Sequence, residues 1–173
     1  KITAVTTSIC TKCHNAMLPD TLDASRMAFN NALEVLRIQL ADKGFLYSPN
    51  YPYFTAKNWG SGQAGANNMV AAFNYKLFLA EPGAYTHSPE YAKQLIIDSI
   101  VALANNGDIN GAIDIDSALN DLYGKGLISN EQLASINNYK DPAVKIPVNC
   151  YACHPTLSSS HSKHIGTLTV TAY

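Results

Sequence analysis

Two short stretches, Cys-Thr-Lys-Cys-His at residues 10–14 and Cys-Tyr-Ala-Cys-His at residues 150–154, share one pattern and use every cysteine of the 173-residue chain. In this CxxCH pattern two thiols add across the vinyl groups of a haem, and the adjacent imidazole binds its iron. One macrocycle therefore explains the residue types, their spacing and their order. The sequence predicts two covalently bound haem c groups, with thioether links from Cys10, Cys13, Cys150 and Cys153 and proximal iron ligands His14 and His154.

Other uses of a CxxC pair compete with haem attachment. Two pairs can hold one tetrahedral zinc ion in a structural module, and a single pair can be a thioredoxin-like dithiol. Neither use needs a histidine directly after the second cysteine. Because both motifs carry that histidine and no cysteine is left over, haem attachment is favoured over zinc binding.

The composition excludes several classes of partner. The formal net charge is −1 and only 14% of residues are charged, so we expect no nucleic-acid-binding surface and no acidic tail. No apolar run approaches the roughly 18 to 20 residues of a membrane-spanning helix.

Haem is attached to CxxCH motifs only after export. We therefore expect a periplasmic or extracellular protein, from which a signal peptide was removed before Lys1.

The apolar periodicity predicts a mainly α-helical chain with long irregular loops and short terminal β-strands, organised by its haems. We expect one di-haem domain over 1–173, with a helical middle at 20–138 between the two haem motifs. The helices are expected at 20–42, 66–80, 88–105, 116–123 and 129–138, with a capping box at Ser129 and Gln132. Residues 45–65 should be irregular, and their aromatic side chains either wall a haem or pack the loop onto the core. Residues 2–9 and 166–173 should be strands that form a terminal hairpin or pair with another chain.

Two apolar stripes are expected to face the core. On the helix at 20–42 the stripe comprises Leu22, Met27, Leu33, Leu36 and Leu40, and on the helix at 66–80 it comprises Met69, Val70, Phe73 and Leu77.

Residues 106–117 follow the early positions of a calcium-binding loop, including the glycine at 111 and the apolar residue at 113. The twelfth position is Ser117, where calcium loops carry a bidentate glutamate, and this should greatly weaken any calcium binding. A polar turn between two helices, shaped by Asn and Asp side chains, is the favoured interpretation.

The chain has five histidines, so three remain for the two distal iron positions once His14 and His154 are proximal ligands. We prefer His87, which lies in a turn between two helices and can be aimed at an iron by a rigid scaffold. His161 and His164 are three residues apart and would share a helical face. One of them is expected to bind a haem, and the other is exposed, hydrogen-bonded or offered to another chain.

The methionines are less favoured as iron ligands. Met17 is too near His14 to reach the opposite side of the same haem, and Met27 and Met69 fall on the expected inward stripes, where methionine usually fills the core.

Residues 72–99 (AFNYKLFLAEPGAYTHSPEYAKQLIIDS) resemble a segment of the extracellular multihaem c-type cytochromes of metal-reducing bacteria. In that family an asparagine-bearing helix, a PGAxxH turn and a YAKxL helix occur together. Residues 150–164 (CYACHPTLSSSHSKH) also resemble its CxxCH followed by HxxH. The two haems expected here depart from the family, whose members usually carry four or more.

The resemblance implies electron transfer outside the cytoplasm through bis-histidinyl haems of low potential. The expected partners are redox proteins or extracellular acceptors. In some members that form filaments, a histidine of one subunit completes the coordination of the haem iron in the next subunit. A homopolymer is therefore a further expectation. Two imidazoles leave the iron no open site, which argues against an enzyme. The rival is a di-haem oxidoreductase, such as a peroxidase, with one open haem site.

Overall fold

The structure is a computed structural model of the chain, and it describes residues 18–55 and 58–140, with side chains from residue 22 onward. Almost all of these residues fall in one compact unit, Asp20–Val144, which is called the helical unit below. Both CxxCH motifs, His161, His164, Met17 and the two expected terminal strands lie outside the described residues.

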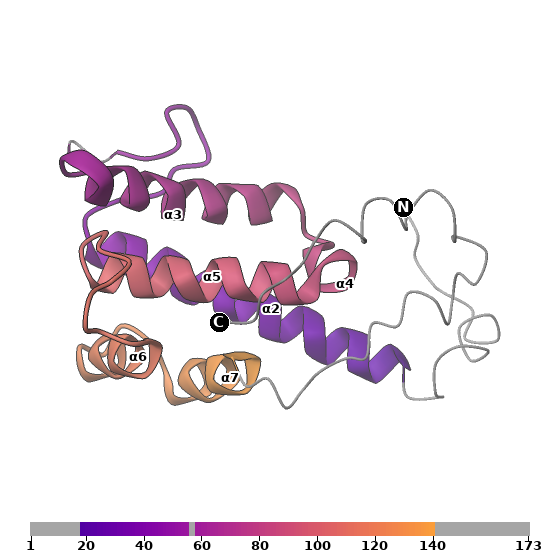
Figure 1. The fold of residues 1–173 in the computed structure, drawn as a ribbon. Helices are drawn as coiled ribbons and strands as arrows, with labels where there is room; N and C mark the ends of the chain where they lie inside the picture. The colour runs from indigo at the N-terminus through magenta and orange to yellow at the C-terminus, as the bar shows by residue number, and fades with distance from the viewer. Residues whose placement is uncertain (1–17, 56–57, 141–173) are drawn as a thin grey trace, which may run out of the picture. The chain divides into compact units, whose positions relative to one another are not determined.

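The prediction of a mainly α-helical chain is confirmed for the described part (Figure 1). The helices there are α2 (Leu18–Asp42), α3 (Gly62–Ala80), α4 (Ala84–His87), α5 (Pro89–Ala104), α6 (Ile115–Gly124) and α7 (Asn130–Lys140). α3 begins four residues earlier than expected, and α4 forms where the sequence predicted only a turn. Within the described residues there is no strand, only an isolated antiparallel bridge between Tyr47 and Phe54. No described helix is both long and apolar enough to cross a membrane.

α5 is the central helix of the helical unit and packs against α3, α4, α6 and α7. α2 joins this core through Phe29, whose ring lies 5.7 Å from that of Phe78 on α3 and 6.2 Å from that of Tyr85 on α4. Removal of these large apolar side chains from water is the main stabilising term of such a core. The largest fully buried apolar side chains are Phe29, Leu36, Leu40, Ile96, Ile100, Leu103, Leu119, Leu122 and Ile136.

The expected inward stripe of α2 is partly wrong. Leu33, Leu36 and Leu40 are buried as predicted, but the Met27 side chain is 62% exposed and Phe29 takes the core position instead. Met27 lies nine residues, or about two and a half helical turns, from Leu36 and so points to the opposite side of the helix. Burial therefore gives no reason to exclude Met27 as a ligand.

The expected inward face of α3 is wrong as a whole. Met69, Val70, Phe73 and Leu77, called the outer face of α3 below, are exposed by 53%, 53%, 65% and 38%. The buried side of α3 instead carries small, polar and aromatic residues, namely Gly65, Asn68, Ala71, Ala72, Asn74, Tyr75 and Phe78.

Close packing explains which side of α3 turns inward. The small side chains of Ala71 and Ala72 let α3 approach α5, and the amide of Asn74 donates a 3.0 Å hydrogen bond to the hydroxyl of Ser99 on α5. Because a buried amide needs a partner, this bond orients α3 on α5.

Local capping signals place most helix ends. Ser88 is the N-cap of α5 and Pro89 follows at its first position, as predicted, although the Ser88 side chain makes no capping hydrogen bond. At Ser129 the predicted capping box is confirmed: the Ser129 N–H donates to Gln132 Oε1 at 2.9 Å, and the Gln132 N–H donates to Ser129 Oγ at 3.2 Å.

The segment between α2 and α3 is irregular, as predicted. Phe45, Tyr47, Phe54 and Trp59 pack in or against the core, whereas Tyr51 and Tyr53 are exposed by 87% and 37%. The rings of Phe45 and Trp59 stack at 4.6 Å, and Phe54 lies 5.9 Å from Trp59. Tyr47 lies 5.1 Å from Tyr75 of α3. The packing interpretation of these aromatic residues is therefore sufficient.

Candidate functional site

His87, the preferred distal ligand, is the last residue of α4, and its side chain is 73% exposed. The backbone beneath it is well tied, since the His87 N–H donates to the Gly83 carbonyl at 3.1 Å and the Ser88 N–H donates to the Ala84 carbonyl at 3.0 Å. Ala84 is buried, and Tyr85 packs on Phe29 of α2. The turn therefore presents an outward imidazole from a backbone that the core holds in place.

Glu81, which sequence reasoning missed, lies beside this imidazole. Its Oε1 is 3.4 Å from His87 Nδ1, and the Glu81 side chain is 54% exposed. The contact occurs over Gly83, where a Cβ would lie 3.0 Å from His87 Cε1 and 3.2 Å from Glu81 Oε1. The EPGAxxH spacing was visible in the sequence, but the carboxylate contact depends on how α4 folds back over the glycine.

The outer face of α3 lies in line with Glu81, the residue beside His87. Met69, Phe73, Leu77 and Glu81 are spaced four residues apart, so they follow one line on the helix surface. Exposed apolar side chains that gather in this way are typical of an interaction or ligand surface rather than of a solvated helix face. The described residues thus place apolar surface next to the only described imidazole.

α2 begins and α7 ends on the side of the helical unit where α5 begins, and Ser88 alone separates α5 from His87. The end of α2 meets the end of α5, because Lys43 donates to the Ala104 carbonyl at 3.3 Å, and α2 therefore begins on the side of α4 (Figure 1). The end of α7 lies near the beginning of α5, since the Glu90 carboxylate is close enough to Tyr139 to act on it. Burial raises the pKa of Tyr139, and the negative charge of Glu90 raises it further. In the sequence, His14 is four residues before Leu18, and Cys150 is ten residues after Lys140.

The loop expected to resemble a calcium site is held by its own side chains. The Asn110 N–H donates to Asp108 Oδ1 at 2.9 Å, and the Ser117 N–H donates to Asp114 Oδ1 at 2.8 Å, which lowers the pKa of Asp114. Among residues 18–55 and 58–140 no group of three or more His, Cys, Asp or Glu side chains could hold a metal ion. The predicted polar turn shaped by Asn and Asp side chains is confirmed.

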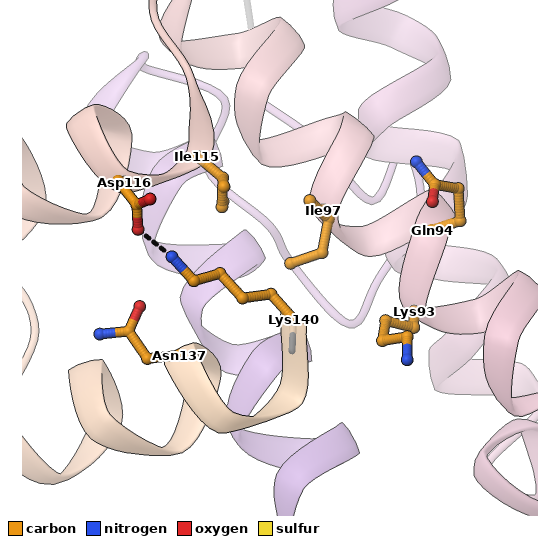
Figure 2. Close-up of a pocket in the computed structure, with 7 residues that line it drawn as sticks. All are labelled: Lys93, Gln94, Ile97, Ile115, Asp116, Asn137 and Lys140. Atoms are coloured by element: carbon orange, nitrogen blue, oxygen red, sulfur yellow. Dashed lines mark hydrogen bonds and ion pairs between the residues drawn. The ribbon is translucent and has the colours of Figure 1, made fainter. Parts of the chain in front are cut away.

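A pocket of about 430 Å³ lies between α5, α6 and α7 (Figure 2). Its two lysines already have acidic partners: Lys93 Nζ lies 2.9 Å from Glu90 Oε2, and Lys140 pairs with Asp116 across the pocket. Because these partners neutralise the two ammonium groups, the pocket offers no free positive charge to an anionic ligand.

Comparison with known proteins points to one group. The search of protein-family profiles and that of solved structures found no match. The C-type polyheme cytochrome OmcC of Geobacter sulfurreducens is 33% identical over 141 residues, which cover 65% of this chain and 18% of OmcC. The C-type polyheme cytochrome OmcB of the same species is 31% identical over 141 residues, covering 65% of this chain and 19% of OmcB.

The chain thus spans less than a fifth of the length of these curated relatives. The predicted resemblance to the multihaem c-type cytochromes of metal-reducing bacteria is confirmed, and this chain is homologous to a part of such proteins.

Proposed function

We propose that this chain transfers electrons through two haems, attached by the CxxCH motifs at 10–14 and 150–154. The observation that carries the proposal is the presence of two complete motifs in a chain homologous to polyheme cytochromes. Bound haem supplies one-electron iron chemistry, while the chain attaches the macrocycle, ligates its iron and sets its surroundings.

Both haems are bis-histidinyl in this proposal, with His14 and His154 as proximal ligands. His87 is the distal ligand of one haem, and His161 or His164 is that of the other. The residues around His87 fit such a group, because an exposed imidazole stands on a tied backbone next to the apolar outer face of α3. With two imidazoles on each iron, no position remains for a substrate, and the iron exchanges electrons only.

The covalent load is tested by the intact mass of the exported protein. The mass should exceed that of the polypeptide by two haems, and denaturing gels should retain haem staining. If the mass equals that of the bare polypeptide and acid releases zinc, the chain is a zinc-binding module and not a cytochrome.

The distal ligand is tested by His87→Ala in the haem-loaded protein. One of two low-spin haems should become high-spin and bind carbon monoxide when reduced, while both thioether links remain. Thr86→Ala is the matched control, since Thr86 is an exposed neighbour in the same turn. A variant that stays fully low-spin would remove His87 from the ligand set.

The rival enzyme is tested on the unaltered protein. A di-haem peroxidase keeps one open or displaceable iron site, so its reduced form should bind carbon monoxide at one haem. We expect no carbon monoxide binding by the native chain.

The location and partners follow from this function. Because CxxCH haems are attached after export, the chain should work in the periplasm or outside the cell, with redox proteins or extracellular acceptors as partners. Pulse labelling should find the haem-loaded chain only outside the cytoplasm.

Assembly into a conductive filament is a further proposal, based on the spare histidine of the 161–164 pair and on the β-branched residues at 2–9 and 166–173. Deletion of residues 166–173 should abolish filaments and leave both haems attached. If the untruncated protein remains a monomer at high concentration, the chain is a diffusing carrier instead.

A further inference from the structure

We propose that Glu81 is a positioning carboxylate for the His87 iron ligand, and that Gly83 is the gap that lets the two side chains meet. The inference rests on the proposed function, since it concerns the histidine assigned there to iron. It adds a residue that orients the imidazole and lowers the reduction potential of that haem.

The geometry divides the roles of the two imidazole nitrogens. Nδ1 faces the Glu81 carboxylate at 3.4 Å, so Nε2, across the ring, is the nitrogen left to bind a metal. Histidines that ligate metals commonly donate the N–H of their other nitrogen to a carboxylate or carbonyl, which fixes the tautomer and the ring orientation. The 3.4 Å contact is longer than a formed hydrogen bond, and we expect it to close once iron holds the imidazole.

The backbone explains why this contact forms. Gly83 has φ −92° and ψ 0°, a right-handed conformation that any residue adopts, so its value here is not conformational freedom. A Cβ at this position would lie 3.0 Å from His87 Cε1, 3.3 Å from His87 Nδ1 and 3.2 Å from Glu81 Oε1. The glycine thus leaves room for the imidazole and the carboxylate to lie together over the turn.

The carboxylate should act on the iron through the imidazole. A negatively charged acceptor on Nδ1–H makes Nε2 a stronger donor, and a stronger donor stabilises ferric iron over ferrous iron. The negative charge of Glu81 acts in the same direction, because reduction adds an electron nearby. Both effects lower the potential of the haem that His87 ligates and leave the other haem unchanged.

The first experiment compares Glu81→Gln with Glu90→Gln in the haem-loaded, full-length protein. Both substitutions remove one negative charge from a half-exposed side chain, at 54% and 58% exposure, but Glu90 pairs with Lys93. Redox titration at one fixed pH should show a positive shift for one haem in Glu81→Gln and none in Glu90→Gln. Electron paramagnetic resonance of the ferric protein should show altered g-values for that same haem.

The second experiment separates position from charge. Gly83→Ala leaves the Glu81 side chain in place and suits the backbone, but its Cβ pushes the imidazole and the carboxylate apart. The potential of the same haem should again rise, with the helical content unchanged by circular dichroism.

Three results would overturn the proposal. The first is an equal shift of the reduction potential in Glu81→Gln and Glu90→Gln. The second is an unchanged potential in both Glu81→Gln and Gly83→Ala. If His87→Ala turns one haem high-spin at the same time, either result would leave His87 a ligand without a positioning carboxylate. If His87→Ala leaves both haems low-spin, the ligand assignment fails, and the role of Glu81 fails with it.

Discussion

The two connections that flank α5 differ in what their polar side chains contact. In residues 105–114, after α5, the side chains of Asn105, Asp108 and Asp114 bond to the backbone of their own loop and of α6. In residues 81–88, before α5, Glu81 and His87 turn outward and contact each other. The polar groups of the later loop hold its backbone, whereas the earlier connection leaves an imidazole and a carboxylate exposed at the place of the proposed iron ligand.

The glycines of the two connections show the same contrast. Gly107 has φ +89°, and a Cβ there would collide with the backbone carbonyl of Ala64 on α3. Its N–H also donates to the Ala102 carbonyl at 2.7 Å, in the bond that ends α5. Gly83 has a backbone that any residue adopts, and its neighbours are movable side chains. Gly107 is therefore needed for the close packing of the backbone, whereas Gly83 leaves room for the side chains of Glu81 and His87.

The same substitution at these glycines should therefore give the largest difference in stability. Gly107→Ala should cost about 3 kcal/mol of unfolding free energy, because it combines left-handed strain with a backbone collision. Gly83→Ala should change the unfolding free energy by no more than about 0.5 kcal/mol. Urea titration followed by circular dichroism measures both, and equal losses would contradict the division between the two connections.

Asn105→Ala should produce the next largest loss. The Asn105 amide donates to the Ile113 carbonyl at 2.7 Å and to the Val101 carbonyl at 3.0 Å, and its oxygen accepts from the Ile113 N–H at 3.0 Å. Loss of these bonds should cost about 1–3 kcal/mol and speed hydrogen exchange at the Ile113 amide. Asn110→Ala is the control, because it is the backbone of Asn110 that bonds within the loop. Similar exchange rates in both variants would show that Asn105 does not hold the loop.

The smallest expected effect depends on pH and concerns Asp114, the N-cap of α6. The hydrogen bond from the Ser117 N–H keeps the folded-state pKa of Asp114 below its ordinary value. The stabilisation is thus fully present above the ordinary carboxyl pKa and is lost as pH falls through the lower folded pKa. Asp114→Asn retains a capping side chain without the titration. The difference in urea midpoint between wild type and Asp114→Asn should shrink from pH 7 towards pH 3, and a constant difference would exclude this linkage.

The helices and most of their ends could be predicted from the sequence. The stop after α2 at Gly44, the Ser88-Pro89 start of α5 and the Ser129 capping box are interactions within a few residues, so the local sequence contains both partners. His87 lies between α3 and α5, as predicted, although it ends the short helix α4 rather than lying in a turn.

The face of α3 could not be predicted in this way. Apolar residues lie on both sides of the helix, so its periodicity does not indicate which side is buried, and the side with more apolar bulk is the exposed one. Ala71, Ala72 and Asn74 turn inward because they match α5, including the hydroxyl of Ser99. Neither the small residues nor the buried amide has a recognisable partner until α3 and α5 are brought together.

The amino-acid sequence by itself determined the type, order and approximate limits of the helices, because capping and helical periodicity act over short distances along the chain. It also carries the expectation of two haems, since attachment chemistry is contained in five consecutive residues. Only the tertiary structure decided that the outer face of α3 stays exposed and that Glu81 meets His87 over Gly83. These outcomes depend on which surfaces fit closely and which polar groups find partners, and that matching exists only after the helices have packed.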